Sequence, residues 1–243
     1  MLYMVMNLIR GEAFSFSEFF AYVIATLAIV MLVLPLHEAA HGFAADKLGD
    51  PTARHMGRLT LNPFAHIDWI GAVFIMLFGF GWAKPVPVNM RNFAKPKRDM
   101  ALTALAGPLS NLIAAFIGMF LIFFSYMFIP LITNDVLYHV LSFVVSVFEF
   151  FTSVNITLAV FNLIPFPPLD GSRLLAAFLP DRIYYRMMQY ERYLHIALLV
   201  LIATDALDPI LSFATSGIYN LFFDFFLFIF DLYIKLFNLG FAI

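Results

Sequence analysis

Residues 17–46 decide the fold, and they read SEFFAYVIATLAIVMLVLPLHEAAHGFAAD. A helix needs about 20 mostly apolar residues to cross the hydrocarbon core of a bilayer, so this stretch predicts a membrane-spanning helix. Its second half carries His37, Glu38 and His41. Ionisable side chains inside a bilayer helix are costly and usually have a function, so these three residues are the first candidates for a site.

The composition of the whole chain agrees with a membrane location. Of 243 residues, 63% are hydrophobic and only 12% are charged, a balance that a soluble domain of this length could not bury. The chain has no cysteine, so a disulfide framework and a cysteine-built zinc site are excluded, and any metal must bind His, Asp or Glu. The net charge of -2 gives no reason to expect a nucleic-acid partner.

Further apolar stretches predict an all-α polytopic membrane protein with about five to six transmembrane helices in contact with lipid. Residues 68–82 are apolar but few and interrupted by glycines, which favours a re-entrant segment over a full crossing. We interpret 1–243 as one membrane-embedded domain, with a core at 17–175 and C-terminal helices at 176–243. Besides residues 17–46, the expected spans are 100–130, 136–163, 217–239 and the less apolar 193–212.

The basic residues indicate which side of the membrane each loop faces, because cytoplasmic loops are rich in Lys and Arg. With five spans, the long loops at 47–99 and 164–192 and the C-terminal end lie on one side, which then holds every Lys and Arg except Arg10. The expected outer loops, at 132–138 and 205–217, contain no Lys or Arg. We therefore expect a multi-pass protein of the cell membrane whose basic loops face the cytoplasm.

His37, Glu38 and His41 have the spacing of half a catalytic zinc site. Side chains four residues apart share a helix face, so both imidazoles can point at one ion while Glu38 reaches the water that attacks a substrate. The alternative is a pair of packed histidines beside a surface glutamate. A catalytic zinc ion normally has three protein ligands, so the sequence should contain one more.

Asp170 is the best candidate for the third ligand. It lies in NLIPFPPLDG at 162–171, where prolines end a predicted helix and an extended turn follows. By itself, Asp170 could also be a helix N-cap before Gly171 and Ser172. Its expected depth in the membrane favours the role of ligand.

Three separate segments are expected to meet near the cytoplasmic third of the membrane. His37 and His41 lie within ten residues of the basic end of their helix, which places them roughly 10 to 15 Å from that end. The segment 107–111 lies at a similar depth on the second span, and Asp170 is three residues before Arg173 at the same face. A site that faces the cytoplasm is therefore predicted.

Three motifs resemble, in the same order, the signature motifs of the site-2 protease family of intramembrane zinc metalloproteases. They are the HEAAH helix, the GPLSN segment at 107–111 and the stretch 162–171. The likeness extends to LNPFAHID at 61–68 and GWAKPVPVN at 81–89, so it covers roughly residues 30–175. The chain resembles a compact form of this family, because it lacks room for the PDZ or CBS domains that some members carry.

The resemblance implies a zinc metalloendopeptidase that cleaves transmembrane proteins or signal-peptide remnants in regulated intramembrane proteolysis, with one Zn2+ per chain. One departure from the family pattern is Ser172, which follows Gly171 where many members have a second glycine. The residues that the resemblance assigns are the general base Glu38, the zinc ligands His37, His41 and Asp170, and the substrate-site residues Asn111 and Asn162.

Residues 82–89 are interpreted as a substrate-binding strand. Apolar positions alternate there with polar or proline positions, and prolines confine a strand to the edge of a sheet. A substrate strand could add to such an edge by backbone pairing. We expect a small membrane-associated β-hairpin or edge strand in which Trp82, Lys84, Val86 and Val88 contact substrate; the alternative is a plain loop on the membrane surface.

Two other classes of protein fit part of the pattern. His and Asp at membrane depth also build ion pathways, so a membrane metal transporter that uses the same His and Asp site is the main alternative. A binding or scaffold protein descended from a protease is the second. The polar residues of the last helix could pack inward, mark a contact between copies in an oligomer or lie along the membrane interface.

Overall fold

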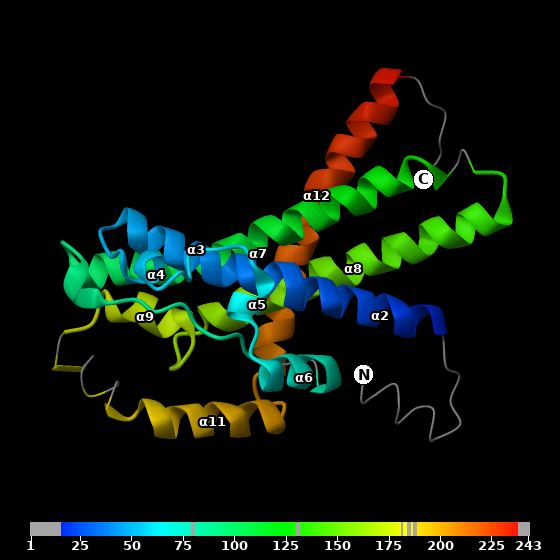
Figure 1. The fold of residues 1–243 in the computed structure, drawn as a ribbon. Coiled ribbons are helices and arrows are strands. Elements are labelled where there is room, and N and C mark those ends of the chain that lie inside the picture. The colour runs from blue at the N-terminus through cyan, green and yellow to red at the C-terminus, as the bar shows by residue number, and fades with distance from the viewer. Residues whose placement is uncertain are drawn as a thin grey trace.

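The computed structural model describes residues 16–78, 81–129, 132–180, 182–183, 186 and 189–237. Every regular element in this part of the chain is helical. Arg10 lies outside the described residues. The first long helical stretch consists of α2 (Phe16–Ala28), the π-helical η1 (Ile29–Val33) and α3 (Leu34–Lys47). The other longer helices are α7 (Pro96–Tyr126), α8 (Asp135–Leu163), α11 (Glu191–Ala203) and α12 (Asp208–Phe237). The short ones are α4 (Thr52–His55), α5 (Pro63–His66), α6 (Trp69–Phe78), the 3-10 helix η2 (Met90–Asn92) and α9 (Asp170–Ala176). Figure 1 shows α12 crossing the other long helices, with α6 and α11 to one side of them.

The first span is one continuous helical rod made of α2, η1 and α3, with a π-helical turn in its middle. Pro35 has no N–H to donate into the helix, and such positions are where helices depart from regular geometry. The N–H of Leu34 bonds the carbonyl of Ile29, five residues back, which is the π-helical pattern. This irregular turn directly precedes the HEAAH residues, so it sets the direction in which α3 presents them.

Helices α7 and α8 form the centre of the bundle, where α7 also packs against α3 and α9. A Cβ atom on Gly118 of α7 would lie 2.3 Å from the hydroxyl oxygen of Thr152 on α8, so the absent side chain allows the two helices to approach closely. On the side away from α9, Met119 and Phe123 of α7 pack with Phe226 of α12 in a shared apolar cluster. Packing at the centre of the bundle therefore holds α7 in place, and α7 is the helix that contacts the candidate metal centre.

Within the described residues, four helices are long and apolar enough to cross a membrane, so the expected number of five to six is not confirmed. They are Phe19–Lys47, Pro96–Tyr126, Asp135–Leu163 and Asp208–Lys235.

The predicted span at 193–212 is wrong. Helix α11 has 13 residues, about 20 Å of rise, which is too short for the roughly 30 Å hydrocarbon core. The chain turns after it at Asp205, which has a φ of 55°, and α12 begins at Asp208.

In the predicted re-entrant segment, residues 68–82, Trp82 lies beside the start of α6; residues 79 and 80 are outside the described part of the chain. Helix α6 has only ten residues, and a Cβ atom on Gly71 near its start would lie 2.0 Å from the carbonyl oxygen of Trp82. The chain therefore returns to the end of α6 at which it entered. This path agrees with a re-entrant segment and does not suit a crossing.

The predicted β-hairpin or edge strand is absent from the described residues. Residues 81–89 form neither a helix nor a strand, and Asn89 at their end has extended backbone angles. No second strand pairs with them in the described part of the chain. Pro85 and Pro87 have no N–H to give to a ladder, and the N–H groups of Lys84 and Val86 bond a loop carbonyl and a side chain. Residues 81–89 are called the extended segment below.

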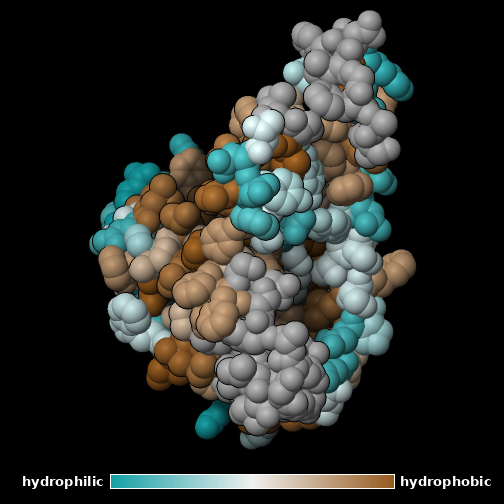
Figure 2. All heavy atoms as spheres, turned by 90° about the vertical axis from the view of Figure 1, so that its right-hand side faces the viewer, coloured by the Kyte–Doolittle hydropathy of each residue, from teal (hydrophilic) through white to brown (hydrophobic). Residues whose placement is uncertain are grey.

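The outer surface of the bundle is apolar, as expected for contact with lipid. Large hydrophobic side chains such as Phe213 and Phe178 are more than four-fifths exposed. Figure 2 shows apolar side chains spread over the face that it presents, with hydrophilic residues gathered in patches between them. Helix α12 packs against α7 and α8 but leaves most of its surface exposed. Its polar stripe consists of Asn220, Asp224, Asp231 and Lys235, of which Asn220, Asp224 and Lys235 are exposed.

Candidate metal centre and substrate cavity

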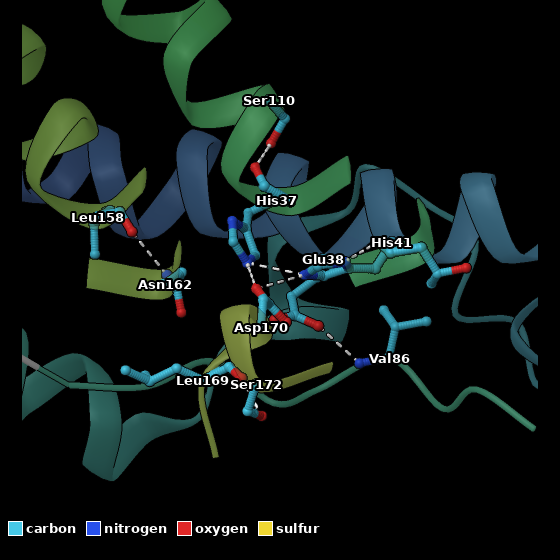
Figure 3. Close-up of polar contacts among 12 residues, drawn as sticks. His37, Glu38, His41, Val86, Ser110, Leu158, Asn162, Leu169, Asp170 and Ser172 are labelled. Atoms are coloured by element: carbon cyan, nitrogen blue, oxygen red, sulfur yellow. Dashed lines mark hydrogen bonds and ion pairs between the residues drawn. The ribbon is translucent and has the colours of Figure 1, made fainter. Parts of the chain in front are cut away.

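The candidate metal centre lies where α3 and α9 meet α7. Helix α3 presents His37 and His41 one turn apart, and Asp170 is the first residue of α9. The two histidine Nε2 atoms lie 3.0 Å apart, and Asp170 Oδ2 lies 3.3 Å from that of His37 and 3.2 Å from that of His41. Figure 3 shows the three side chains pointing at one another. Within the described residues, this is the one group of three such side chains placed to share a metal ion.

This triangle of atoms has the dimensions of a tetrahedral zinc site. Zinc binds histidine nitrogen and carboxylate oxygen at about 2.0 to 2.2 Å, so two ligand atoms of a tetrahedral site lie about 3.3 Å apart. The observed separations of 3.0 to 3.3 Å fit that edge. Three protein ligands also leave a fourth position open, as catalytic zinc sites do. The donor set therefore fits a catalytic zinc ion.

Neighbouring groups orient the ligands. His41 Nδ1 lies 2.7 Å from the carbonyl oxygen of Thr103 on α7, so a neutral ring carries its proton on Nδ1 and leaves Nε2 for a metal. Burial raises the pKa of Asp170, but when His37 and His41 carry protons on Nε2 their hydrogen bonds and positive charge outweigh burial, and the pKa of Asp170 falls below its ordinary value. The carboxylate is therefore ionised, as a metal ligand must be. Sequence reasoning missed Thr103, although it lies on the same face of its helix as Gly107, four residues later.

Gly107 is the point at which α7 touches the metal centre. A Cβ atom on this residue would lie 2.3 Å from His41 Nε2 and 2.6 Å from His37 Cε1. Real Cβ atoms do not approach other atoms so closely, and both neighbours are ring atoms on a packed helix. Only glycine therefore fits here without moving the two imidazoles.

Replacing Gly107 with alanine is expected to weaken zinc binding by about 10- to 100-fold, the range seen when groups that position metal ligands are changed. Zinc content after dialysis against a buffered zinc series measures the change. Gly217→Ala is the matched control, because this helical glycine has nothing within 4 Å of its added Cβ atom. Gly118→Ala disturbs the contact between α7 and α8 without touching the histidines, so zinc loss in that variant to the same degree would contradict the specific role of Gly107.

A cavity of about 230 Å³ opens beside the metal centre and brings the predicted site residues together. Lys84 is the exception, because its side chain is exposed and does not line the cavity. Thr103 and Arg173 also line it and were not predicted. The predicted residues that line the cavity are His37, Glu38, His41, Trp82, Val86, Val88, Asn111, Asn162 and Asp170.

The two predicted asparagines differ in how their amides are satisfied. Asn162 Nδ2 donates to the carbonyl of Leu158 on its own helix at 3.0 Å. Asn111 is only 1% exposed, and neither its Oδ1 nor its Nδ2 has a hydrogen-bond partner among the described residues. A buried amide without partners is costly, so Asn111 has full hydrogen-bonding capacity left for a group that enters the cavity.

Glu38 faces the extended segment across the cavity. Its Oε2 atom accepts a hydrogen bond of 2.8 Å from the backbone N–H of Val86, which Figure 3 shows beside the metal centre. Glu38 is thus close to the ligands without being part of the His37, His41 and Asp170 triangle. This contact could not be predicted from the sequence, because the two residues lie 48 positions apart.

Asp50 fastens the far end of the extended segment. This fully buried carboxylate accepts hydrogen bonds from the N–H of Asn89 at 2.6 Å and from the side chain of Asn92 at 2.7 Å. Burial raises the pKa of Asp50, but these bonds and those from Thr52 outweigh burial and lower it overall. Asp50 therefore stabilises the folded chain fully at a pH above its pKa in the unfolded chain, which is about 3.9. This stabilisation is lost as the pH falls through the pKa of Asp50 in the folded chain.

Two histidines and one aspartate around a single point, with a glutamate beside the first histidine, define the metal site of a zinc-dependent hydrolase, and here it lies within an apolar helical bundle. The chain belongs to a peptidase family with that description: the sequence profile of Peptidase family M50 matches residues 25–204. Membership confirms the resemblance to the site-2 proteases, and zinc is the cofactor that it implies. The chain is accordingly a membrane protein of a metalloprotease family.

The chain is similar to two proteins that are named as zinc metalloproteases. "Putative zinc metalloprotease YwhC" of Bacillus subtilis (strain 168) is 40% identical over 201 residues, which cover 81% of this chain and 90% of the relative. "Putative zinc metalloprotease Rip2" of Mycolicibacterium smegmatis (strain ATCC 700084 / mc(2)155) is 27% identical over 192 residues, which cover 76% of this chain and 69% of the relative. No solved structure matches the chain.

Proposed function

We propose that this chain is an intramembrane zinc metalloprotease that hydrolyses peptide bonds of transmembrane substrates within or near the bilayer. The observation that carries the proposal is the meeting of His37, His41 and Asp170 within 3.0 to 3.3 Å, beside Glu38 and a cavity, inside a bundle of apolar helices. Family membership and the names of the relatives support proteolysis as the reaction.

His37, His41 and Asp170 would hold the zinc ion, and Glu38 would be the general base. Bound zinc would supply Lewis acidity, which lowers the pKa of water toward 7 and polarises a peptide carbonyl. Glu38 would accept a proton from the attacking water and pass it to the amine that leaves. Its position next to His37, outside the triangle of ligand atoms, supports this division of roles.

Asn111 and Asn162 would hold the substrate. The peptide oxygen gains negative charge as water attacks, and fixed donors aimed at that oxygen stabilise the transition state. Asn111 is the stronger candidate for this donor, because both polar atoms of its buried amide are free among the described residues. Asn162 already gives one N–H to Leu158, so it would bind the substrate through its remaining groups.

The substrate is expected to reach the site as an extended chain. The carbonyl groups of a transmembrane helix are already hydrogen-bonded, so the helix must unwind locally before water can attack. Trp82, Val86 and Val88 line the cavity along the extended segment, where they would contact the unwound chain. A transmembrane protein or a signal-peptide remnant would be the partner in this reaction.

The site would face the cytoplasm in a multi-pass protein of the cell membrane. The metal centre lies toward the ends of α3 and α7 that adjoin the basic loops, and the positive-inside rule places those loops in the cytoplasm. The exposed polar stripe of α12 remains available for contact with another copy of the chain or with the membrane interface.

Cleavage by the full-length chain in proteoliposomes tests the proposal. With a transmembrane substrate that carries a label at each end, we expect fragments from the zinc-loaded protein, background levels after chelation, and recovery when zinc is added back. The zinc content of the protein is followed in parallel. Zinc flux into the liposomes without any fragment would instead support a metal transporter and contradict the protease.

A further inference from the structure

The extended segment presents one edge of its backbone to Glu38. In an extended chain the N–H and C=O of one residue share an edge, and successive residues face opposite edges. Lys84 gives its N–H to the carbonyl of His66 at 2.7 Å, and Val86 gives its N–H to Glu38 Oε2 at 2.8 Å. Val86 and Val88 both line the cavity. We call the edge formed by residues 84, 86 and 88 the inner edge.

The opposite edge cannot support regular strand pairing. Pro85 and Pro87 alternate with the residues of the inner edge, and neither has an N–H to donate. The carbonyl of Pro85 accepts a hydrogen bond of 3.3 Å from the same Arg58 nitrogen that contacts the carbonyl of Lys84 at 2.8 Å. A substrate strand that both donates to the segment and accepts from it must therefore use the inner edge. Among the described residues, the C=O of Val86 and both backbone groups of Val88 form no hydrogen bond, so the inner edge has free positions next to the one that Glu38 occupies.

Val86 itself is held on both sides, whereas the partly buried side chain of Glu38 borders the cavity. On one side of Val86 the guanidinium of Arg58 donates to the carbonyl of Lys84 at 2.8 Å, and on the other Asp50 holds Asn89. The Val86 side chain is 7% exposed and packs over Gly42 of α3. Any exchange of partners at the Val86 N–H must therefore come from movement of Glu38.

We propose that the Val86 N–H holds Glu38 in a resting position, and that a substrate strand pairing with the inner edge takes over this N–H and releases the carboxylate to act as general base. A substrate residue paired with Val86 would place its carbonyl oxygen where Glu38 Oε2 now lies, because both need the same donor. Val86 would thus be a positioning residue that links substrate pairing to activation. This inference rests on the proposed protease function.

Removing the Val86 N–H should change two activities in opposite directions. In Val86→Pro the donor is lost, so Glu38 is free without substrate, and cleavage of a tripeptide amide too short to pair with the inner edge should rise about tenfold. Cleavage of the labelled transmembrane substrate should fall by at least about tenfold, because its pairing with Val86 is lost. Zinc content should stay at the wild-type value.

Two companion variants keep this test decisive if proline disturbs the segment. Replacing Val86 with α-hydroxyisovaleric acid exchanges only the N–H for an oxygen atom and should reproduce the opposite changes. Val86→Ala keeps the N–H, so the ratio of the two activities should stay at the wild-type value even if both decrease.

Three results would count against these ideas, in distinguishable ways. If both activities fall together in the ester variant, Val86 is only structural and the inference is wrong. If neither activity changes, the Val86 N–H does not restrain Glu38 and the inference is equally wrong. A zinc-loaded wild-type protein that cleaves neither substrate overturns the proposed protease function, and the inference with it.

Discussion

Replacing Glu38 with glutamine is expected to lower the rate of substrate cleavage by about 10²- to 10⁴-fold, the contribution of a positioned general base, while zinc stays bound. Glutamine has nearly the same shape but cannot accept the proton of the attacking water. It can still accept the Val86 N–H through its amide oxygen, so the extended segment should remain in place. Fragment yield in proteoliposomes and zinc content per chain measure the two effects.

Glu149→Gln is the matched control for this variant. Glu149 is also an acid within a long apolar helix, α8, and its carboxylate lies 3.3 Å from the hydroxyl of Tyr126. It does not line the cavity, so Glu149→Gln should cleave at close to the wild-type rate. Cleavage retained by Glu38→Gln would refute the assigned base, and loss of its zinc would mean that Glu38 supports the metal rather than the proton transfer.

The candidate site could be predicted from the sequence because much of its geometry is local. Helix periodicity alone places His37 and His41 on one face, with Glu38 beside them, once the helix is recognised. Asp170 is remote in the chain, but the basic loops fix the depth of each span and so predict that its segment reaches the same level. The four long spans were predictable for a similar reason, since length and apolarity decide them.

The features that were predicted wrongly or missed depend on contacts between distant segments. Residues 82–89 alternate like a strand, but their N–H groups bond Glu38, Asp50 and the His66 carbonyl rather than a second strand. Residues 193–212 are mostly apolar, yet the chain turns at Asp205 between two helices. The pattern of apolar and polar residues in one sequence does not indicate which backbone groups form hydrogen bonds with side chains far away in the chain.

Replacing Asp170 with alanine is expected to weaken zinc binding by at least about 100-fold and to reduce cleavage to background. Changing a group that merely supports a metal ligand already costs about 10- to 100-fold in affinity, and here the ligand itself is removed. The two imidazoles would remain, but two ligands from one helix do not complete a three-ligand site. Zinc affinity by competition with a chelating dye and fragment yield are the measurements.

Asp208→Ala is the control for loss of an acid at the first turn of a helix, because Asp208 begins α12, is exposed and lies outside the cavity. It should bind zinc and cleave as the wild type does. Zinc affinity in Asp170→Ala within about twofold of the wild type would contradict the assignment of this carboxylate as a ligand.

The fold should survive the loss of Asp170, which makes this variant informative about the metal rather than about folding. Among the described residues, the carboxylate contacts only His37 and His41, and the start of α9 is held independently by the Ser172 N–H and hydroxyl, which both bond the carbonyl of Leu169. Gly171 packs against the carbonyl of Leu163, so the turn keeps its position at the end of α8. A folded, zinc-free and inactive Asp170→Ala protein would therefore show that one carboxylate from α9 joins two histidines of α3 in holding the ion on which cleavage depends.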